Sequence, residues 1–416
     1  MIYNEMQIPD HIIELDKNSP LESKKSEFLL PDDTIYMDGN SLGPTTKSAL
    51  DEIETTTKAH WRNDLISSWN KHSWITLPQK VGEKIAPLLG AKSSEVIGCD
   101  SISVNLFKLL SAALKINHSR NIIVSESGNF PTDLYIAEGL ESLLGKTKCS
   151  LKTVEKSAII DSLNTDVAVL MLTHVDFRSG EKLDIRAITK AAHDKGILVL
   201  WDLAHSAGAL KLDLDHDNVD FAVGCGYKYL NGGPGAPAFV YVAERHIKTI
   251  EQPLRGWMGH TSPFDFTPSY KPATDISKML CGTPSVISMA SLNGALDVFQ
   301  DVDMAVIEQQ AHALKQTFLS TLTNEAITDL KLITPTNSQS QGSQLSFTHE
   351  YAFELSQALI ANKIIVDFRA PNVLRLGFTP LYLEHRHVYL AATILTTLLK
   401  HQEYLKPQFR ERKAVT

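Results

Sequence analysis

The chain has 416 residues, of which 43% are hydrophobic, and it carries a formal net charge of −8. This composition excludes intrinsic disorder and low-complexity repeats, and the acidic balance argues against a nucleic-acid partner or an anionic membrane surface, both of which favour basic patches. The length is typical of two or three domains of about 150 residues each, with cores that need no disulfide or metal ion for stability.

The first predicted elements are two helices. Residues 45–66 place Leu50 and Ile53 on one side of a helix with an acidic start. Residues 77–89 form a second helix, which Gly90 ends because glycine readily adopts the left-handed conformation that follows a helix.

Helices and apolar strands alternate in the middle of the chain. We expect helices over 104–116, 131–144 and 185–195, and strands over 121–124, 150–154, 167–172, 196–201, 220–224 and 237–242. Strands that are apolar on both faces and alternate with helices form a mostly parallel sheet that is covered on both sides. The predicted fold class is therefore α/β.

The order of elements changes after residue 285. A long helical stretch over 286–323 precedes short strands over 344–347, 364–366 and 373–378, and a final helix is expected over 387–405. This order is typical of a smaller α+β domain.

The cysteines and the N-terminal residues indicate a cytoplasmic protein. Cys99, Cys149, Cys225 and Cys281 lie far apart and form no CxxC pair, so we expect small buried residues rather than disulfides or metal ligands. The first 20 residues lack a basic segment followed by an apolar stretch, and no apolar run approaches the roughly 18 residues of a membrane span. We therefore predict a cytoplasmic location, no metal site and no membrane contact.

Two strand ends in the α/β region carry polar residues. Asp202 follows the strand over 196–201, and Lys228 follows the strand over 220–224, between two tyrosines and before a glycine-rich turn. In open α/β sheets, ligands bind beyond the carboxyl ends of the strands. Each residue alone also has a structural explanation, because Asp202 is equally compatible with capping a helix and an isolated lysine usually faces solvent.

The spacing of these two residues favours a functional explanation. Asp202 and Lys228 are 26 residues apart (228 − 202), and each ends a neighbouring buried strand. A pyridoxal 5′-phosphate site of the aminotransferase kind needs such a pair, because the lysine forms a Schiff base and the aspartate keeps the pyridine nitrogen protonated. No glycine fingerprint of a nucleotide-binding protein precedes a helix. The sequence therefore predicts pyridoxal phosphate as the cofactor.

Eight segments, spread in order over most of the chain, resemble those of kynureninases. They are YMDGNSLG (36–43), SVNL (103–106), FPTD (130–133), THV (173–175), DLAH (202–205), YKYLN (227–231), GW (256–257) and RLG (375–377). The resemblance implies an aminotransferase-like fold (fold type I), with a three-layer αβα large domain and a smaller α+β domain. It also implies hydrolysis of L-kynurenine, and of 3-hydroxykynurenine, to anthranilate or 3-hydroxyanthranilate and L-alanine. This reaction belongs to tryptophan catabolism, the kynurenine pathway towards NAD biosynthesis.

The resemblance also assigns roles to individual positions. The implied cofactor-binding residues are Ile102, Ser103, Phe130, Asp133, Thr173, Asp202, His205, Tyr227, Lys228, Trp257 and Thr283. The implied catalytic residues are Lys228, Tyr227 and Asp202. The implied substrate-binding residues are Arg375, Asn40 and Ser41. Of these, the arginine would hold the substrate α-carboxylate as a planar fork.

The resemblance further implies an assembly and a division into domains. Thr283 is implied to contact the phosphate in the neighbouring subunit, so the expected unit is a homodimer with shared active sites. The expected domains are a cofactor-binding domain over 61–294 and a small domain that joins 1–60 with 295–416. Phe177 departs from the family pattern, because many kynureninases have tyrosine there.

Several alternatives stay open. Trp69 and Trp74 are as compatible with plain packing as with lining the pocket for the aminophenyl ketone, and Arg178 is a second candidate for the carboxylate. The preference between kynurenine and 3-hydroxykynurenine is not predicted. Rival functions are a cysteine desulfurase or transaminase of the same superfamily, or a binding protein without activity. A desulfurase needs a mobile thiol, for which Cys281 is loosely placed.

Overall fold

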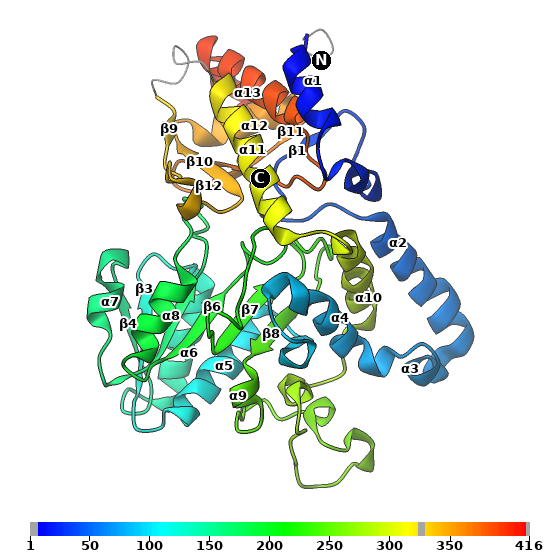
Figure 1. Cartoon of the computed structure of the whole chain (residues 1–416), viewed down its shortest axis with the longest axis vertical. Coiled ribbons are helices and arrows are strands. Elements are labelled where there is room, and N and C mark those ends of the chain that lie inside the picture. Colours follow the sequence, from blue (N-terminus) through cyan, green and yellow to red (C-terminus); the bar gives the residue numbers. More distant parts are fainter. Residues whose placement is uncertain (1–6, 323–328, 413–416) are drawn as a thin grey trace.

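The computed structural model describes residues 7–322 and 329–412, and its larger part is built on a seven-stranded sheet (Figure 1). The strand order is β2-β8-β7-β6-β5-β3-β4. The strands are β2 (Val96–Gly98), β3 (Ile122–Glu126), β4 (Ser150–Val154), β5 (Val167–Thr173), β6 (Leu198–Asp202), β7 (Phe221–Cys225) and β8 (Ala238–Val242). Strands β4, β3, β5, β6 and β7 run parallel, whereas β8 is antiparallel to both β7 and β2. The mostly parallel sheet is therefore confirmed.

Helices cover both faces of this sheet. Side chains alternate along β5, so that Val169 and Met171 join one hydrophobic core while Leu170 and Leu172 join another. The first core includes α5 (Ile102–Ile116) and α6 (Pro131–Leu144); the second includes α4 (Leu77–Ile85), α8 (Ile185–His193) and α10 (Val286–Ala295). The result is the three-layer αβα arrangement.

A four-stranded antiparallel sheet lies at the other end of the molecule (Figure 1). Its strands, in spatial order, are β12 (Asp367–Arg369), β13 (Val373–Gly377), β10 (Gln344–Thr348) and β9 (Lys331–Leu332). The helices beside it are α11 (Met304–Thr321), α12 (Ala352–Ala361) and α13 (His385–Lys400). The predicted smaller α+β unit is confirmed in these elements.

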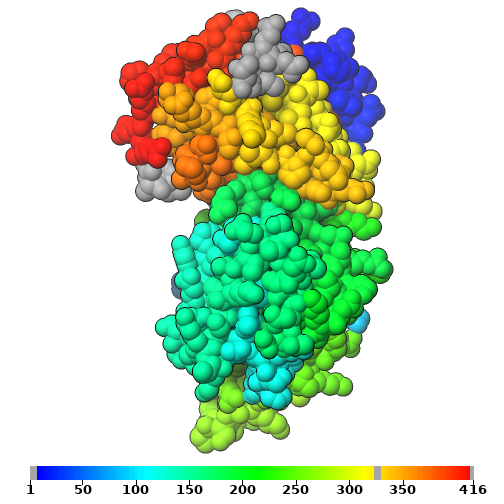
Figure 2. All heavy atoms as spheres, turned by 90° about the vertical axis from the view of Figure 1, so that its left-hand side faces the viewer, coloured from blue at the N-terminus to red at the C-terminus, as the bar shows by residue number. Residues whose placement is uncertain are grey.

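The N-terminal segment lies against the C-terminal third of the chain (Figure 2). Strand β1 (Ile35–Tyr36) pairs in parallel with β11 (Ile364–Ile365). Helix α1 (Asp10–Lys17) packs on α13, where the Asp16 carboxylate accepts the backbone N–H of His385 at 2.6 Å. This bond satisfies an amide at the start of α13 that has no partner within the helix.

Two long predicted helices are shorter or interrupted. Helix α2 (Lys47–Glu54) continues as a π-helix over Thr55–Asp64, so the regular α-helix expected over 45–66 was wrong in its second half. The stretch expected over 286–323 divides into α10 and α11, because Asp303 caps a new helix by accepting the N–H of Ala305 at 2.8 Å. Residue 323 lies outside the described residues.

Cys99, Cys149 and Cys225 are buried, Cys281 is half-buried, and all four are free thiols. Within residues 7–322 and 329–412, no group of three or more His, Cys, Asp or Glu side chains is arranged to hold a metal ion. Over the same residues, no helix combines the length and the apolar character that crossing a bilayer requires.

Candidate active site

A cavity of about 330 Å³ opens at the carboxyl ends of β5, β6 and β7. Its wall contains nine residues that the sequence predicted as cofactor ligands: Ile102, Ser103, Phe130, Asp133, Thr173, Asp202, His205, Tyr227 and Lys228. The other lining residues are Ser101, Thr132, Phe177, Ala204, Cys225, Ala236 and Ala238. The volume falls in the range of small-molecule sites in proteins, which starts at about 300 Å³.

Two buried carboxyl groups form one end of the cavity. Thr173 and Asp202 are paired across β5 and β6, and the Thr173 hydroxyl lies 3.4 Å from Asp133 Oδ2. Burial raises the pKa of Asp133 well above its ordinary value, and the neighbouring Asp202 carboxylate adds to this rise. Burial also raises the pKa of Asp202, but the positive charge of Lys228 opposes it. Of the two carboxyl groups, Asp133 is therefore the more easily protonated, and Asp202, beside the positive charge of Lys228, is the more easily ionised.

The backbone after Asp202 differs from the sequence prediction. Residues 203–210 form turns, so the expected helix after this strand was wrong. The Asp202 carboxylate still accepts a backbone N–H, from Ala204 at 2.7 Å, as an Asx-type turn rather than a helix cap. This bond fixes one carboxylate oxygen and leaves the other for the carboxyl partner and the cavity.

Lys228 lies on the loop after β7 and lines the cavity. Its Nζ lies 6.0 Å from the centre of the Phe130 ring and 5.8 Å from the centre of the Tyr227 ring. Gly43, from the N-terminal segment, donates its N–H to the Tyr227 carbonyl at 2.8 Å. A Cβ at position 43 would lie 2.2 Å from the Lys228 carbonyl oxygen, so only glycine permits this approach.

The N-terminus of α5 forms another part of the cavity wall. Ser101 caps this 15-residue helix by accepting the N–H of Val104 at 3.4 Å, and the next two residues, Ile102 and Ser103, line the cavity. The first amides of a helix have no partners within the helix, and the helix dipole favours negative charge there. This end can therefore bind a phosphate group.

Aromatic side chains and a neutral histidine complete the wall. The rings of Phe130 and Phe177 meet edge to face with centres 5.2 Å apart. His205 Nδ1 lies 3.2 Å from Gln344 Oε1, and burial, followed by the charges of Lys228 and Arg375, lowers the pKa of His205 well below its ordinary value. His205 is therefore a neutral ring that can pack against a planar ligand.

The cavity has the parts that pyridoxal phosphate needs. Asp202 can accept a hydrogen bond from a protonated ring nitrogen, the N-terminus of α5 can bind the phosphate, and the Lys228 amine lines the same cavity. Phe130 and His205 are flat side chains of its wall. The chemistry of these residues fits the cofactor.

The three predicted substrate ligands lie beside the cavity, in or near the small sheet. Arg375, on β13, donates from Nη1 to the Phe177 carbonyl at 2.5 Å and from Nη2 to Ser41 Oγ at 3.2 Å. Asn40 is fully buried, and neither of its amide atoms has a hydrogen-bond partner among the described residues. Arg375 is joined to the cavity wall through Phe177.

Trp257 and Thr283 do not line the cavity of their own chain. The Trp257 ring packs against Phe264 and Phe266, whose centres lie 5.5 Å and 6.3 Å away. Thr283 is exposed and lies on a separate hollow of about 150 Å³ that Cys281 also lines. Two of the eleven predicted cofactor ligands are therefore outside this site.

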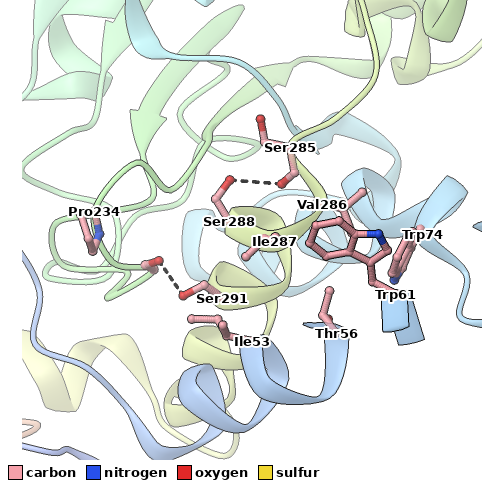
Figure 3. Close-up of a pocket in the computed structure, with 11 residues that line it drawn as sticks. Ile53, Thr56, Trp61, Trp74, Pro234, Ser285, Val286, Ile287, Ser288 and Ser291 are labelled. Carbon is pink, nitrogen blue, oxygen red and sulfur yellow. Dashed lines mark hydrogen bonds between the residues drawn. The ribbon is translucent and has the colours of Figure 1, made fainter. Parts of the chain in front are cut away.

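An apolar hollow of about 580 Å³ lies near the start of α10 (Figure 3). Trp61 and Trp74 form one side of it, and Val286 and Ile287 another. Trp69 meets Trp74 edge to face with ring centres 6.0 Å apart, so the two predicted tryptophans form one cluster away from the Lys228 cavity.

His174, which follows Thr173, titrates in a way that affects stability. Its ring is buried, its Nδ1 lies 2.7 Å from Ser206 Oγ, and burial lowers its pKa to about 3. Below pH 6.5 the unfolded chain binds a proton here that the folded chain does not, so stability is lost as pH falls from about 6.5 towards 3. Between pH 7.5 and 4.5 we expect protonation of His174 to lower the unfolding free energy of the parent by about 3 kcal/mol. His174→Gln should lack this part of the loss.

Urea unfolding of the two proteins at both pH values measures this difference. His118→Gln, at an exposed position, is the matched control and should leave the pH dependence unchanged. An equal loss of stability in the parent and in His174→Gln would show that His174 does not contribute to acid sensitivity.

The fold and the cavity together define a pyridoxal-phosphate enzyme of the aminotransferase fold. Among solved structures, the chain is similar to the cystine C–S lyase C-DES in complex with cysteine persulfide, with a TM-score of 0.76 and 18% identity over 88% of this chain and 98% of that one. It is also similar to the apo cysteine desulfurase of Thermococcus onnurineus NA1, with a TM-score of 0.72 and 20% identity over 95% and 99% of the two chains. At these identities the likeness shows the fold alone.

Sequence relatives define the family. The chain is 45% identical to a kynureninase of Deinococcus radiodurans over 94% of this chain and 96% of that protein. It is 44% identical to a kynureninase of Burkholderia mallei over 99% and 100% of the two chains. Residues 307–395 match the family described as the kynureninase C-terminal domain. The chain belongs to the kynureninase family.

Proposed function

We propose that this protein hydrolyses L-kynurenine to anthranilate and L-alanine with pyridoxal phosphate as cofactor, and 3-hydroxykynurenine to 3-hydroxyanthranilate and L-alanine. The placement in tryptophan catabolism belongs to the same proposal. The observation that carries it is the joint placement of Lys228, Asp202 and the α5 N-terminus around one cavity in a chain of this family.

The bound cofactor supplies an electron sink for the carbanion that forms at the substrate. Asp202 holds the proton on the ring nitrogen, with Asp133 as its more easily protonated neighbour. Lys228 Nζ takes the proton from the substrate Cα. Burial raises the pKa of Tyr227 above its ordinary value, so its phenol keeps a proton that it can donate in the later steps.

The remaining cofactor and substrate roles follow from position. Thr173 fixes the carboxyl end of the cavity through its contact with Asp133. Arg375 and Ser41 take the carboxylate end of the substrate, with Asn40 behind them. Together they orient the substrate so that its Cα faces Lys228.

We also propose that the active unit is a homodimer in which Trp257 and Thr283 reach the phosphate end of the partner's site. Neither residue lines the cavity of its own chain. Large apolar side chains that line the hollow of Figure 3 are exposed, among them Trp61 at 57% and Ile287 at 43%. An exposed apolar area of this kind is typical of a subunit interface.

We propose that the chain forms a cofactor domain over 61–294 and a small domain that joins 1–60 with 295–416. The pairing of β1 with β11 supports this division, because it joins the N-terminal segment to the C-terminal third of the chain. We also propose a cytoplasmic enzyme that acts on a small molecule and has no nucleic-acid or membrane partner. The net charge of −8 supports the last point.

A single assay tests the proposed reaction. The purified protein is incubated with pyridoxal phosphate and L-kynurenine, and the fluorescence of anthranilate should rise in proportion to enzyme concentration. Release of sulfide from L-cysteine, with no anthranilate, would indicate a desulfurase instead. Burial raises the pKa of the Cys225 thiol, the cysteine in the cavity wall, and that of Cys281, which makes both poor nucleophiles.

A further inference from the structure

We propose that Arg369 is a second positioning arginine, beside Arg375, for the carboxylate of an amino-acid substrate. The inference rests on the proposed function for the identity of the substrate. Its structural basis is a pair of arginines that share the Asp367 carboxylate. Arg375 donates hydrogen bonds from all three of its nitrogens, whereas Arg369 uses one.

Strands β12 and β13 bring the two arginines together. Asp367 pairs with Arg375 across these strands. Asp367 Oδ2 accepts a hydrogen bond from Arg375 Nε at 2.9 Å and a further one from Arg375 Nη2. The same oxygen lies 3.1 Å from Arg369 Nη2 and accepts the Ser41 hydroxyl at 3.1 Å. One carboxylate oxygen therefore lies between two guanidinium groups.

The two guanidinium groups differ in their free donors. Arg375 uses all three of its nitrogens, on Asp367, on Ser41 and on the Phe177 carbonyl, and its side chain is 1% exposed. Arg369 uses only Nη2, while its Nε and Nη1 have no hydrogen-bond partner among the described residues, and its side chain is 40% exposed. Arg369 can therefore offer the bidentate face that a carboxylate prefers.

The positive charges around Arg369 exceed the negative ones, which favours the binding of an anion. Two guanidinium groups face one carboxylate, and the nearby Asp38 does not supply a full second negative charge, because burial and the charge of Asp367 raise its pKa to about 7. Arg369 is joined to the cavity wall by contacts: its Nη2 lies 3.4 Å from Ser41 Oγ, which also contacts Arg375, and Arg375 donates to the carbonyl of the cavity-lining Phe177. A substrate carboxylate at this place would restore neutrality beside the reacting atoms.

Removing the charge of Arg369 tests the inference. With Arg369→Gln we expect the KM for L-kynurenine to rise about tenfold or more, while kcat stays within about threefold, because the carboxylate contact is made before and throughout the reaction. Kynuramine, which is kynurenine without its carboxylate, should inhibit the parent and the variant equally. Arg369→Lys keeps the charge and should recover part of the KM.

Three other arginines serve as comparisons. Arg375→Gln should raise the KM and also lower the melting temperature, since it leaves Asp367 buried without its main partner. Arg186→Gln, at an exposed position of α8, is the matched control and should leave the KM unchanged. Arg178 is the other arginine that the sequence offered for the carboxylate, and a higher KM in Arg178→Gln but not in Arg369→Gln would overturn the inference.

Further measurements separate a positioning role of Arg369 from a purely structural one. An unchanged KM in Arg369→Gln, or equal weakening of kynurenine and kynuramine binding, would assign Arg369 a purely structural role. Binding of L-alanine, followed through the absorbance of the holoenzyme, should weaken in Arg369→Gln and stay unchanged in Arg186→Gln. This measurement does not require kynurenine turnover, so a failure of the proposed reaction and a failure of this inference are distinguishable.

Discussion

Lys228→Ala should abolish turnover of L-kynurenine and the visible absorbance that borohydride reduction removes. Lys228 Nζ lies about 6 Å from the centres of two aromatic rings of the cavity wall, and Lys228 is the lysine among the cavity's lining residues. Removing it takes away both the covalent anchor and the base for the substrate Cα. Absorbance spectra before and after borohydride, with the anthranilate assay, measure the two losses.

Lys190→Ala is the matched control for this substitution, because Lys190 is an exposed lysine on α8 that pairs with Asp194. It should keep both the absorbance and the activity of the parent. Turnover by Lys228→Ala at a tenth of the parental rate or more would contradict the role assigned to Lys228.

The same variant also tests the shared active site. Thr283→Glu places a negative charge where the partner's phosphate is proposed to bind, so we expect it to be inactive alone. In a hybrid of Lys228→Ala with Thr283→Glu chains, one of the two sites carries both changes and the other carries neither. Mixing and refolding the two inactive proteins should therefore restore activity. No recovery in isolated hybrids would place Thr283 in its own chain's site.

Asp202→Asn should lower kcat by roughly 10³-fold, which corresponds to about 4 kcal/mol of lost transition-state stabilisation. An amide cannot hold a proton on the ring nitrogen as a carboxylate does, so the electron sink is weakened. Asp202 is buried and has Asp133 as its neighbour, and the neutral amide leaves no unpaired charge in the core. We therefore expect the fold and the borohydride-sensitive absorbance to persist.

A buried carboxylate at the other end of the same sheet provides the control. Asp220 precedes β7 and lies 2.7 Å from His193 Nε2 and 2.8 Å from His246 Nε2. Burial alone would raise the pKa of Asp220, but the hydrogen bonds with these two histidines lower it below its ordinary value. Asp220→Asn should reduce the melting temperature and leave kcat near that of the parent. Equal losses of kcat in the two variants would indicate that Asp202 acts through stability alone.

The sequence was sufficient for those parts of the fold that have a strong local signal. Helix α6 was predicted at its observed bounds, because Pro131 marks its first turn and Gly145 follows its last residue. Strands β1 and β12 were not predicted, since strands of two or three residues carry no periodicity. The turns after Asp202 were missed because an aspartate that accepts the N–H of Ala204 has the same sequence pattern as a helix cap.

The candidate site was predicted where each residue ends a strand or begins a helix. Nine of the eleven predicted cofactor ligands line one cavity. Phe177 was noticed only as a departure from the family pattern, although its ring lines the cavity and its carbonyl holds Arg375. Asp367 was missed, because its ion pair with Arg375 across β12 and β13 depends on strand register and not on sequence spacing. Arg369 was missed with it, because its place in the site follows from its contact with Asp367.

The segment over 38–43 connects the two arginines of the small sheet with the loop that holds Lys228. Ser41 touches both arginines of the small sheet, and two residues later Gly43 donates its N–H to the carbonyl that precedes Lys228. A carboxylate ligand that orders Ser41 would therefore also steady the loop that holds the cofactor. Linkage makes this coupling reciprocal, so a carboxylate inhibitor should tighten the binding of pyridoxal phosphate by the same free energy with which the cofactor tightens the binding of the inhibitor.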